Sequence, residues 1–251
     1  MINTTRNIFE THTGNLIHKW DHYFEIYDRY FHKYMGQEVI VLEIGVSQGG
    51  SIDLWKKYFG DKLRYFGIDI NPKCKQFEDE NVTIFIGSQD DAVFLEQVKK
   101  QLPDLDILID DGGHSMKQQI VTFEVMYDKI KDNGIYFCED NHTSYWHSFG
   151  GGMKRRGTYI EYIKNLVDVM HLWYAGKNTF IKNHLYMDKI YSIHFYNSIV
   201  IIEKRKITTP FDIKTGNFTV GYVEEKNVTT TQKISYLYYG IKNRIRSFFY
   251  K

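Results

Sequence analysis

The sequence has little cysteine, almost no net charge and no long apolar run. Cys74 and Cys138 are its two cysteines, and neither belongs to a CxxC pair, which argues against a disulfide framework and favours a reducing, cytoplasmic setting. No run approaches the ~18 apolar residues of a membrane span, and the N-terminus lacks an apolar signal region. Lys and Arg number 32 against 31 Asp and Glu, so the overall charge does not indicate nucleic acid as a partner. We therefore expect a soluble cytoplasmic protein.

From residue 39 onward, short apolar runs rich in β-branched residues alternate with helical segments. The pattern predicts strands at 39–43, 64–69, 82–86, 105–109 and 135–138. The predicted helices are 51–59, a second one that ends near residue 101, 117–131 and 158–173. Residues 190–194 and 198–203 form a predicted hairpin. Such alternation is typical of right-handed βαβ units, and it predicts an α/β fold with a doubly wound, Rossmann-like, seven-stranded sheet.

The 251 residues are enough for one large domain with three parts. Residues 1–37 are expected to be helical, because aromatic residues recur every three to four positions between His18 and Tyr34. This helix either packs on the sheet edge or forms a lid over substrate. Residues 38–205 are the predicted core and 206–251 a C-terminal extension. Its basic, aromatic end, 234–251, either contacts a membrane surface or acidic partner, or is a solvated or oligomer-packing helix.

The glycine turn after the first strand is typical of a nucleotide-cofactor site. Gly45, Gly49 and Gly50 allow the backbone to approach a ligand closely, and Ser51 is a candidate helix cap. The dinucleotide pattern G-x-G-x-x-G is not met, because Ser47 stands at its second glycine. The turn therefore favours S-adenosylmethionine, a cationic cofactor without phosphate, over NAD.

Polar or acidic residues follow nearly every predicted strand. In an open parallel sheet, ligands bind beyond these carboxyl ends. Asp69 ends the second strand, where a carboxylate accepts the hydroxyls of a ribose. The remaining residues of this set are Glu43, Gln89, Asp110, Asp111, Glu139 and Asp140. An acidic rim of this kind suits the sulfonium and ammonium groups of S-adenosylmethionine.

Three of these carboxylates indicate a metal site. Ends of neighbouring strands lie ~5 Å apart, so Asp111, Glu139 and Asp140 are expected to converge. Crowded carboxylates need a cation, and an all-oxygen set suits Mg²⁺, Mn²⁺ or Ca²⁺. His114, three residues after Asp111, is then placed as a general base. The alternative is that these carboxylates only cap helices and bind loop amides.

Five runs together carry a family resemblance. They are 42–51 (LEIGVSQGGS), 65–72 (YFGIDINP), 85–89 (FIGSQ), 109–114 (IDDGGH) and 138–146 (CEDNHTSYW). Over about residues 15–175 the chain resembles the metal-dependent S-adenosylmethionine sugar O-methyltransferases, which include the mycinamicin type and bacterial enzymes found with polysaccharide genes. The resemblance implies a class I methyltransferase fold.

The resemblance also implies roles for single residues. It places Asp111, Glu139 and Asp140 at metal-ligand positions and makes His114 the base, with Asp111 also in the catalytic group. Cofactor positions match Glu43, Gly45, Asp69, Gln89 and Asp110, and we add the neighbouring residues Ser51, Ile70 and Ser88. Two departures loosen any inference about the substrate. Glu139 stands where the antibiotic enzymes usually have Asp, and Asn141 where relatives often have Leu.

Residues 150–157 are the best candidate for a substrate loop. Lys154, Arg155 and Arg156 follow three glycines and are suited to the diphosphate of a nucleotide-sugar, although a solvated linker is the alternative. His142 and Tyr145 are further candidate substrate contacts.

The favoured function is methyl transfer from S-adenosylmethionine to a hydroxyl of a sugar or nucleotide-sugar, assisted by Mg²⁺ or Mn²⁺. It belongs to capsule, lipopolysaccharide or glycoside biosynthesis in a bacterium, and homo-oligomers are compatible with it. Two alternatives remain: a cephalosporin-hydroxylase-like enzyme and a non-catalytic scaffold of the same fold.

Overall fold

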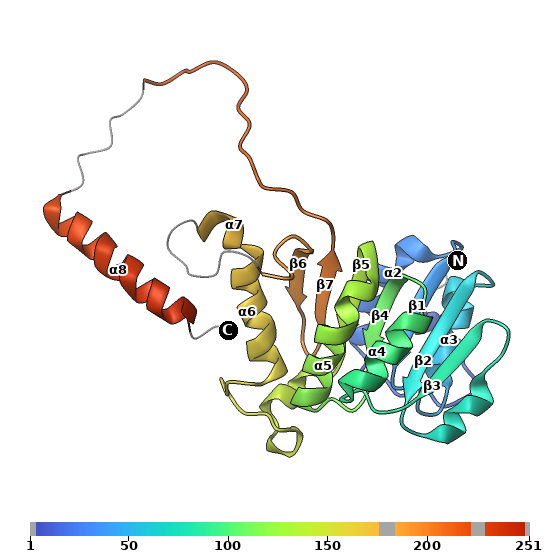
Figure 1. Cartoon of the computed structure of the whole chain (residues 1–251). Coiled ribbons are helices and arrows are strands. Elements are labelled where there is room, and N and C mark those ends of the chain that lie inside the picture. Colours follow the sequence, from blue (N-terminus) through green and yellow to red (C-terminus); the bar gives the residue numbers. More distant parts are fainter. Residues whose placement is uncertain (1–3, 176–183, 222–228, 249–251) are drawn as a thin grey trace.

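A computed structural model describes residues 4–175, 184–221 and 229–248 (Figure 1). Its centre is a seven-stranded sheet in the order β3-β2-β1-β4-β5-β7-β6. Neighbouring strands from β3 to β5 are parallel, whereas β7 pairs antiparallel with both β5 and β6. The strands are β1 Val39–Ile44, β2 Leu63–Asp69, β3 Val82–Ile86, β4 Leu105–Asp110, β5 Ile130–Cys138, β6 Ile190–Phe195 and β7 Val200–Lys204. The predicted α/β fold with a doubly wound, seven-stranded sheet is confirmed.

Helices cover both faces of this sheet because its central strands are apolar on both sides. Val41 and Ile107 face one layer, which contains the fully buried Trp55, while Leu42 and Leu108 face the other, which contains Phe123. Each such side chain stabilises the fold by roughly 1.5–3 kcal/mol through burial. The helices of the core are α2 Tyr23–Phe31, α3 Gly50–Phe59, α4 Ala92–Gln101, α5 Met116–Met126, α6 Tyr159–Met170 and α7 Leu172–Ala175.

The chain order reverses at β1, whose neighbours are β2 on one side and β4 on the other. At such a switch point the loops after adjacent strands leave toward opposite faces and open a crevice. The glycine turn follows β1 and the Asp110–Asp111 pair stands at the end of β4, so both predicted motifs lie at this crevice.

The N-terminal part differs from the prediction in where its helix begins. α1 spans Thr5–Glu10, and α2 begins at Tyr23 rather than near His18. Tyr23, Phe24, Tyr27 and Phe31 of α2 are buried against the sheet, which agrees with a helix packed on it. Residues 11–22, which we call the N-terminal strap, are irregular because their polar groups bind the core: the backbone N–H of Asn15, for example, donates to Asp53.

Two predicted boundaries were wrong. Ser51 does not cap α3: the N-cap is Gly49, whose φ of 79° favours glycine, and Ser51 lies inside the helix. The helix predicted at 117–131 ends at Met126, and after a short 3-10 turn, Tyr127–Lys129, β5 already begins at Ile130. Ile130 pairs with Leu105, and an irregularity in the ladder follows, so tertiary pairing overrides the helical periodicity there.

The C-terminal extension leaves the sheet after β7. Residues 206–221 have no regular structure, and α8 spans Thr230–Phe248, beginning four residues before the predicted 234–251. Residues 249–251 lie outside the described part. Figure 1 shows α8 apart from the sheet and its covering helices. Within 4–175, 184–221 and 229–248, no helix combines the length and apolar character needed to cross a bilayer.

Candidate functional site

A cavity of about 510 Å³ lies at the carboxyl ends of β1, β2 and β4. Three segments far apart in the sequence form its wall: the glycine turn, the end of β2 and the loop after β4. Of the candidate residues, it brings together Gly45, Ser51, Asp69, Ile70, Ser88, Gln89, Asp111, His114 and Asp140. Its size and its place at the switch point suit a small-molecule cofactor.

Asp69 organises the glycine turn. Its Oδ2 accepts hydrogen bonds from the backbone N–H groups of Val46, at 3.0 Å, and Ser47, at 2.9 Å. Its Oδ1 accepts another from Asn71, at 2.8 Å. These bonds hold Ser47 at a φ of 51°, which side chains other than glycine rarely adopt. The carboxylate thus fixes the turn at the cavity wall, and it retains acceptor capacity toward the cavity.

Gly45 allows the turn to touch the end of β4. Its φ is 97°, and a Cβ there would lie 2.0 Å from the backbone oxygen of Asp111. No side chain fits that gap, so glycine is required where β1 and β4 carry their functional loops side by side.

Asp110 acts on the cavity through Gln89 rather than by lining it. Its fully buried carboxylate accepts hydrogen bonds from Gln89, at 2.9 Å, and from the hydroxyl of Tyr136, at 3.0 Å. Burial raises the pKa of Asp110 to about 7. The other end of Gln89 accepts the N–H of Gly113 at 2.6 Å, so this network fixes the loop after β4. Ser88 at the cavity edge donates to Asp90.

Glu43 also lies behind the cavity wall. It is fully buried, and its Oε2 accepts hydrogen bonds from Trp55, at 3.0 Å, and Tyr65, at 2.8 Å. Burial raises the pKa of this carboxyl above its usual value. Its Oε1 lies 3.8 Å from the ammonium of Lys19, which makes Glu43 part of a buried charge cluster.

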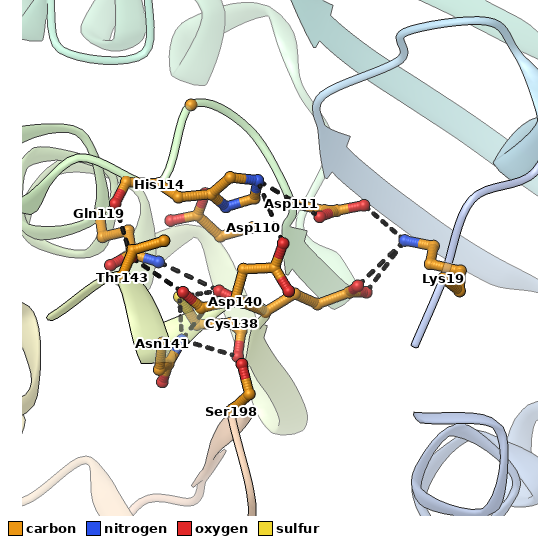
Figure 2. Close-up of polar contacts among 12 residues, drawn as sticks. Lys19, Asp110, Asp111, His114, Gln119, Cys138, Asp140, Asn141, Thr143 and Ser198 are labelled. Carbon is orange, nitrogen blue, oxygen red and sulfur yellow. Dashed lines mark hydrogen bonds and ion pairs between the residues drawn. The ribbon is translucent and has the colours of Figure 1, made fainter. Parts of the chain in front are cut away.

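Lys19 of the N-terminal strap reaches between the ends of β4 and β5 (Figure 2). Its Nζ lies 2.5 Å from Asp111 Oδ2 and 3.1 Å from Glu139 Oε2, and its side chain is only 2% exposed. Burial disfavours the ammonium, but Asp111, Glu139 and Glu43 outweigh it and raise the pKa of Lys19 well above its usual value. No local sequence pattern marks this lysine as part of the site.

Asp111, His114 and Asp140 form the group best placed for a divalent cation. One ligand atom of each lies within 4.8 Å of the others. His114 Nε2 is 3.9 Å from Asp111 Oδ1 and 3.6 Å from Asp140 Oδ2, and Figure 2 shows the ring above these two carboxylates. Glu139 is not in this group, because its carboxylate binds Lys19 and the hydroxyl of Tyr27, the latter at 2.7 Å.

The backbone of this group is strained. His114 and Asp140 have φ values of 56° and 53°. Such strain persists only where surrounding contacts impose it, and it concentrates at functional sites. Tyr23 donates to Asp140 Oδ1 at 2.7 Å, and Thr143 donates to the backbone oxygen of His114 at 2.8 Å. Among the described residues, the buried Nδ1 of His114 has no hydrogen-bond partner.

Of the candidate substrate residues, His142 and Tyr145 follow Asp140 closely in the chain. His142 Nδ1 is 2.5 Å from Ser198 Oγ, and its ring packs against Trp146 at 4.5 Å and Trp20 at 5.6 Å between centroids. Tyr145 is 47% exposed. This set gives an exposed aromatic surface next to Asp140, a surface type on which sugar rings stack.

The loop 150–157 is anchored at its glycines and open at its basic residues. Gly151 and Gly152 donate to the backbone oxygens of Trp146, at 2.9 Å, and Ser144, at 2.8 Å. Lys154, Arg155 and Arg156 are exposed and do not line the cofactor cavity. The structure therefore separates the basic loop from the cofactor side of the site.

No family model matches the chain, but relatives and solved structures do. It is 32% identical over 190 residues to mycinamicin VI 2''-O-methyltransferase of Micromonospora griseorubida, covering 71% of this chain and 47% of that protein. Over 197 residues it is 32% identical to 8-demethyl-8-(2-methoxy-alpha-L-rhamnosyl)-tetracenomycin-C 3'-O-methyltransferase of Streptomyces olivaceus, covering 74% and 50%.

In structure, the chain is similar to MycE methyltransferase from the mycinamycin biosynthetic pathway, solved in complex with Mg, SAH and mycinamycin VI. The TM-score is 0.65 at 30% identity, and the match covers 73% of this chain and 50% of that chain. The chain thus spans about half the length of the curated relatives it matches. The family resemblance seen in the five sequence runs is confirmed.

Proposed function

Because this chain is homologous to the sugar O-methyltransferases of macrolide and tetracenomycin biosynthesis, we propose that it transfers a methyl group from S-adenosylmethionine to a sugar hydroxyl. The observation that carries the proposal is the Asp111–His114–Asp140 group at the edge of the switch-point cavity. That arrangement supports a cation site and a base beside a cofactor-sized space. Together with the exposed aromatic surface, it has the parts that methylation of a sugar needs.

The cavity fits the cofactor in shape and in charge. Asp69 offers acceptors to ribose hydroxyls, the exposed side chain of Ile70 gives an apolar wall, and Gln89 offers polar atoms. The buried carboxylates behind the wall favour a cationic ligand. S-adenosylmethionine supplies an activated methyl group, and a divalent cation supplies positive charge that favours an ionised acceptor oxygen.

The acidic cluster fits Mg²⁺ or Mn²⁺. Glu43, Asp111 and Glu139 crowd three carboxylates around the ammonium of Lys19, and Asp140 lies beside His114. Carboxylate oxygens are the ligands that Mg²⁺ and Mn²⁺ prefer. We assign Asp111, Glu139 and Asp140 as the ligands and leave His114 as the base. This assignment requires Glu139 to leave Lys19.

His114 is built to take a proton from the acceptor hydroxyl. Its Nε2 faces Asp111 and Asp140, which stabilise the imidazolium once the proton has moved. Thr143 holds its backbone, so the ring keeps its orientation.

The proposed acceptor is a nucleotide-sugar or a glycoside of surface-polysaccharide or glycoside biosynthesis. The basic residues 154–156 support a diphosphate, and the aromatic surface around His142 supports a sugar ring. The hydroxylase alternative has less support. His142 Nδ1 is held by Ser198, and the metal-type group found among the described residues contains one histidine, not two.

The test is binding and transfer with purified protein. Calorimetry measures S-adenosylhomocysteine affinity, and a labelled methyl group is followed into a panel of nucleotide-sugars and glycosides in the presence of Mg²⁺. Binding of the cofactor product together with labelling of at least one acceptor supports the proposal. Absence of cofactor binding by a folded protein would reject it.

A further inference from the structure

Lys19 occupies the space between two of the proposed metal ligands. Its Nζ bridges Asp111 and Glu139, at 2.5 and 3.1 Å, and is 2% exposed. Two cations within the same few ångströms repel each other strongly when water is excluded. A divalent cation held by both carboxylates therefore cannot coexist with the ammonium in this position.

The strap that carries Lys19 also covers the cofactor cavity. Leu16 and His18 line that cavity, and the backbone oxygen of Leu16 would lie only 2.2 Å from a Cβ on Gly50 at the start of α3. Trp20, next to Lys19, packs edge-on against His142. Besides Lys19, Asn15 and His22 make hydrogen bonds outside the strap and Ile17 is buried in the core, but Leu16 and Trp20 are 70% and 52% exposed. A shift of Lys19 would therefore move the cavity cover.

We propose that Lys19 and a divalent cation are alternative partners of the Asp111–Glu139 pair, so that metal binding withdraws Lys19 and releases the N-terminal strap. Without metal, Lys19 neutralises the carboxylates and keeps the site assembled. With metal, Glu139 joins Asp111 and Asp140, and the strap moves from the cavity. This inference rests on the proposed function and adds a metal-linked gate to it.

The test uses Mn²⁺ alone, without methyl donor. Calorimetry compares the wild type with Lys19→Met, which removes the competing charge, with Lys19→Arg, which keeps it, and with Lys62→Met, which removes an exposed lysine elsewhere. We expect Lys19→Met to bind Mn²⁺ at least about 10-fold more tightly than the wild type. In the wild type, only the fraction of molecules with Lys19 withdrawn can bind the metal, which lowers the apparent affinity. Lys19→Arg and Lys62→Met should not gain affinity.

Hydrogen exchange of the wild type provides a readout that needs no variant. Mn²⁺ should speed exchange in the strap, residues 11–22, and leave β1 unchanged. Unaltered strap exchange at saturating Mn²⁺, or a Lys19→Met affinity equal to or below that of the wild type, would overturn the proposal, as would failure of both proteins to bind Mn²⁺. S-adenosylhomocysteine affinity, measured on the same samples, reports on the methyltransferase assignment separately.

A second, independent observation concerns α8. At 100° per residue, its exposed apolar side chains Ile234, Leu237, Tyr238, Ile241 and Ile245 fall within an arc of about 100° along one face, each at least half exposed. Lys233 and Arg244 border one side of this stripe and Lys242 the other. Residues 230–248 contain no Asp or Glu.

We infer that α8 lies in the interface of an anionic lipid membrane. A helix of 19 residues is about 28 Å long, too polar on its far face to span a bilayer but shaped to lie along its surface. The basic borders match anionic headgroups, and the stripe enters the acyl boundary. In the sequence, the irregular segment 206–221 and residues 222–228 stand between the core and this helix.

Cosedimentation of the full chain with vesicles tests this inference. Binding is expected to phosphatidylcholine vesicles containing phosphatidylglycerol, to weaken with salt, and to fall with Leu237→Glu or with Lys233→Gln combined with Lys242→Gln. Tyr236→Glu, at an exposed position on the opposite face of α8, should have little effect on vesicle binding. No binding to anionic vesicles would contradict the inference, and so would a concentration-dependent dimer that Leu237→Glu abolishes, since a second copy would then cover the stripe.

Discussion

The ammonium of Lys19 lies 2.5 Å from Oδ2 of Asp111, although 92 residues separate them in the chain. The contact joins the N-terminal strap to the end of β4 and places a positive charge inside the acidic cluster (Figure 2). The site is therefore completed by a segment outside the sheet and its crossover helices.

Asp69→Ala should weaken binding of S-adenosylhomocysteine by roughly 1.5–3 kcal/mol, as for the loss of a hydrogen bond to a charged group. The change removes an acceptor for the ribose and also frees the N–H groups of Val46 and Ser47. Calorimetry on folded protein measures the effect, with Asp61→Ala as a surface control. Unchanged affinity would remove Asp69 from the cofactor site.

Neutralising the basic loop should affect the sugar and not the cofactor. In the combined variant Lys154→Gln, Arg155→Gln and Arg156→Gln, KM for a nucleotide-sugar should rise while S-adenosylhomocysteine affinity stays the same, because these residues do not line the cavity. The combined variant Lys62→Gln, Lys99→Gln and Lys100→Gln, which also removes three positive charges but outside the site, controls for total charge. If KM does not change, the loop is a solvated linker.

His114→Ala should lower kcat by ~10²–10⁴, the usual contribution of a positioned base. If His114 is the base and not a metal ligand, Mn²⁺ and cofactor affinities should stay close to the wild-type values. His147→Ala, which removes an exposed histidine nearby, is the control. If His114→Ala keeps the wild-type kcat under conditions where chemistry limits the rate, His114 is not the base. If the variant loses Mn²⁺ affinity, His114 is a metal ligand.

Gly45→Ala should cost stability and activity together. Its φ of 97° would strain alanine by about 1–3 kcal/mol, and the added Cβ would collide with the backbone of Asp111. Thermal unfolding should shift to lower temperature than for Gly60→Ala, where φ is 84° but the space around the Cβ is open. Equal shifts would show that strain, not the close approach of β1 and β4, requires glycine at position 45.

Local patterns predicted most of the sheet and the acidic rim. The strands are encoded by continuous apolar runs, and carboxyl ends of parallel strands necessarily meet at one edge, so the convergence of Asp111 and Asp140 followed from the order of elements. The sequence also placed Glu139 beside them. Its side chain turns instead to Lys19 and Tyr27, which only the tertiary arrangement reveals.

What escaped the sequence analysis depends on contacts across long separations. Lys19 is the one lysine of the N-terminal strap, and no spacing marks its partner 120 residues later, Glu139. Glu43 and Asp110 stand at strand ends as expected, but burial assigns them to Trp55, Tyr65 and Gln89 rather than to the cavity surface. A local sequence pattern does not show how deeply a side chain at a strand end is buried.

The most direct test of the account is metal-dependent methyl transfer. Labelled S-adenosylmethionine and a sugar acceptor are incubated with protein stripped by EDTA, then with added Mg²⁺ or Mn²⁺, in parallel for the wild type and Asp140→Asn. The account predicts that transfer vanishes on chelation and returns with metal in the wild type, and that Asp140→Asn loses this return because a ligand charge is gone. Full transfer after exhaustive chelation would contradict it.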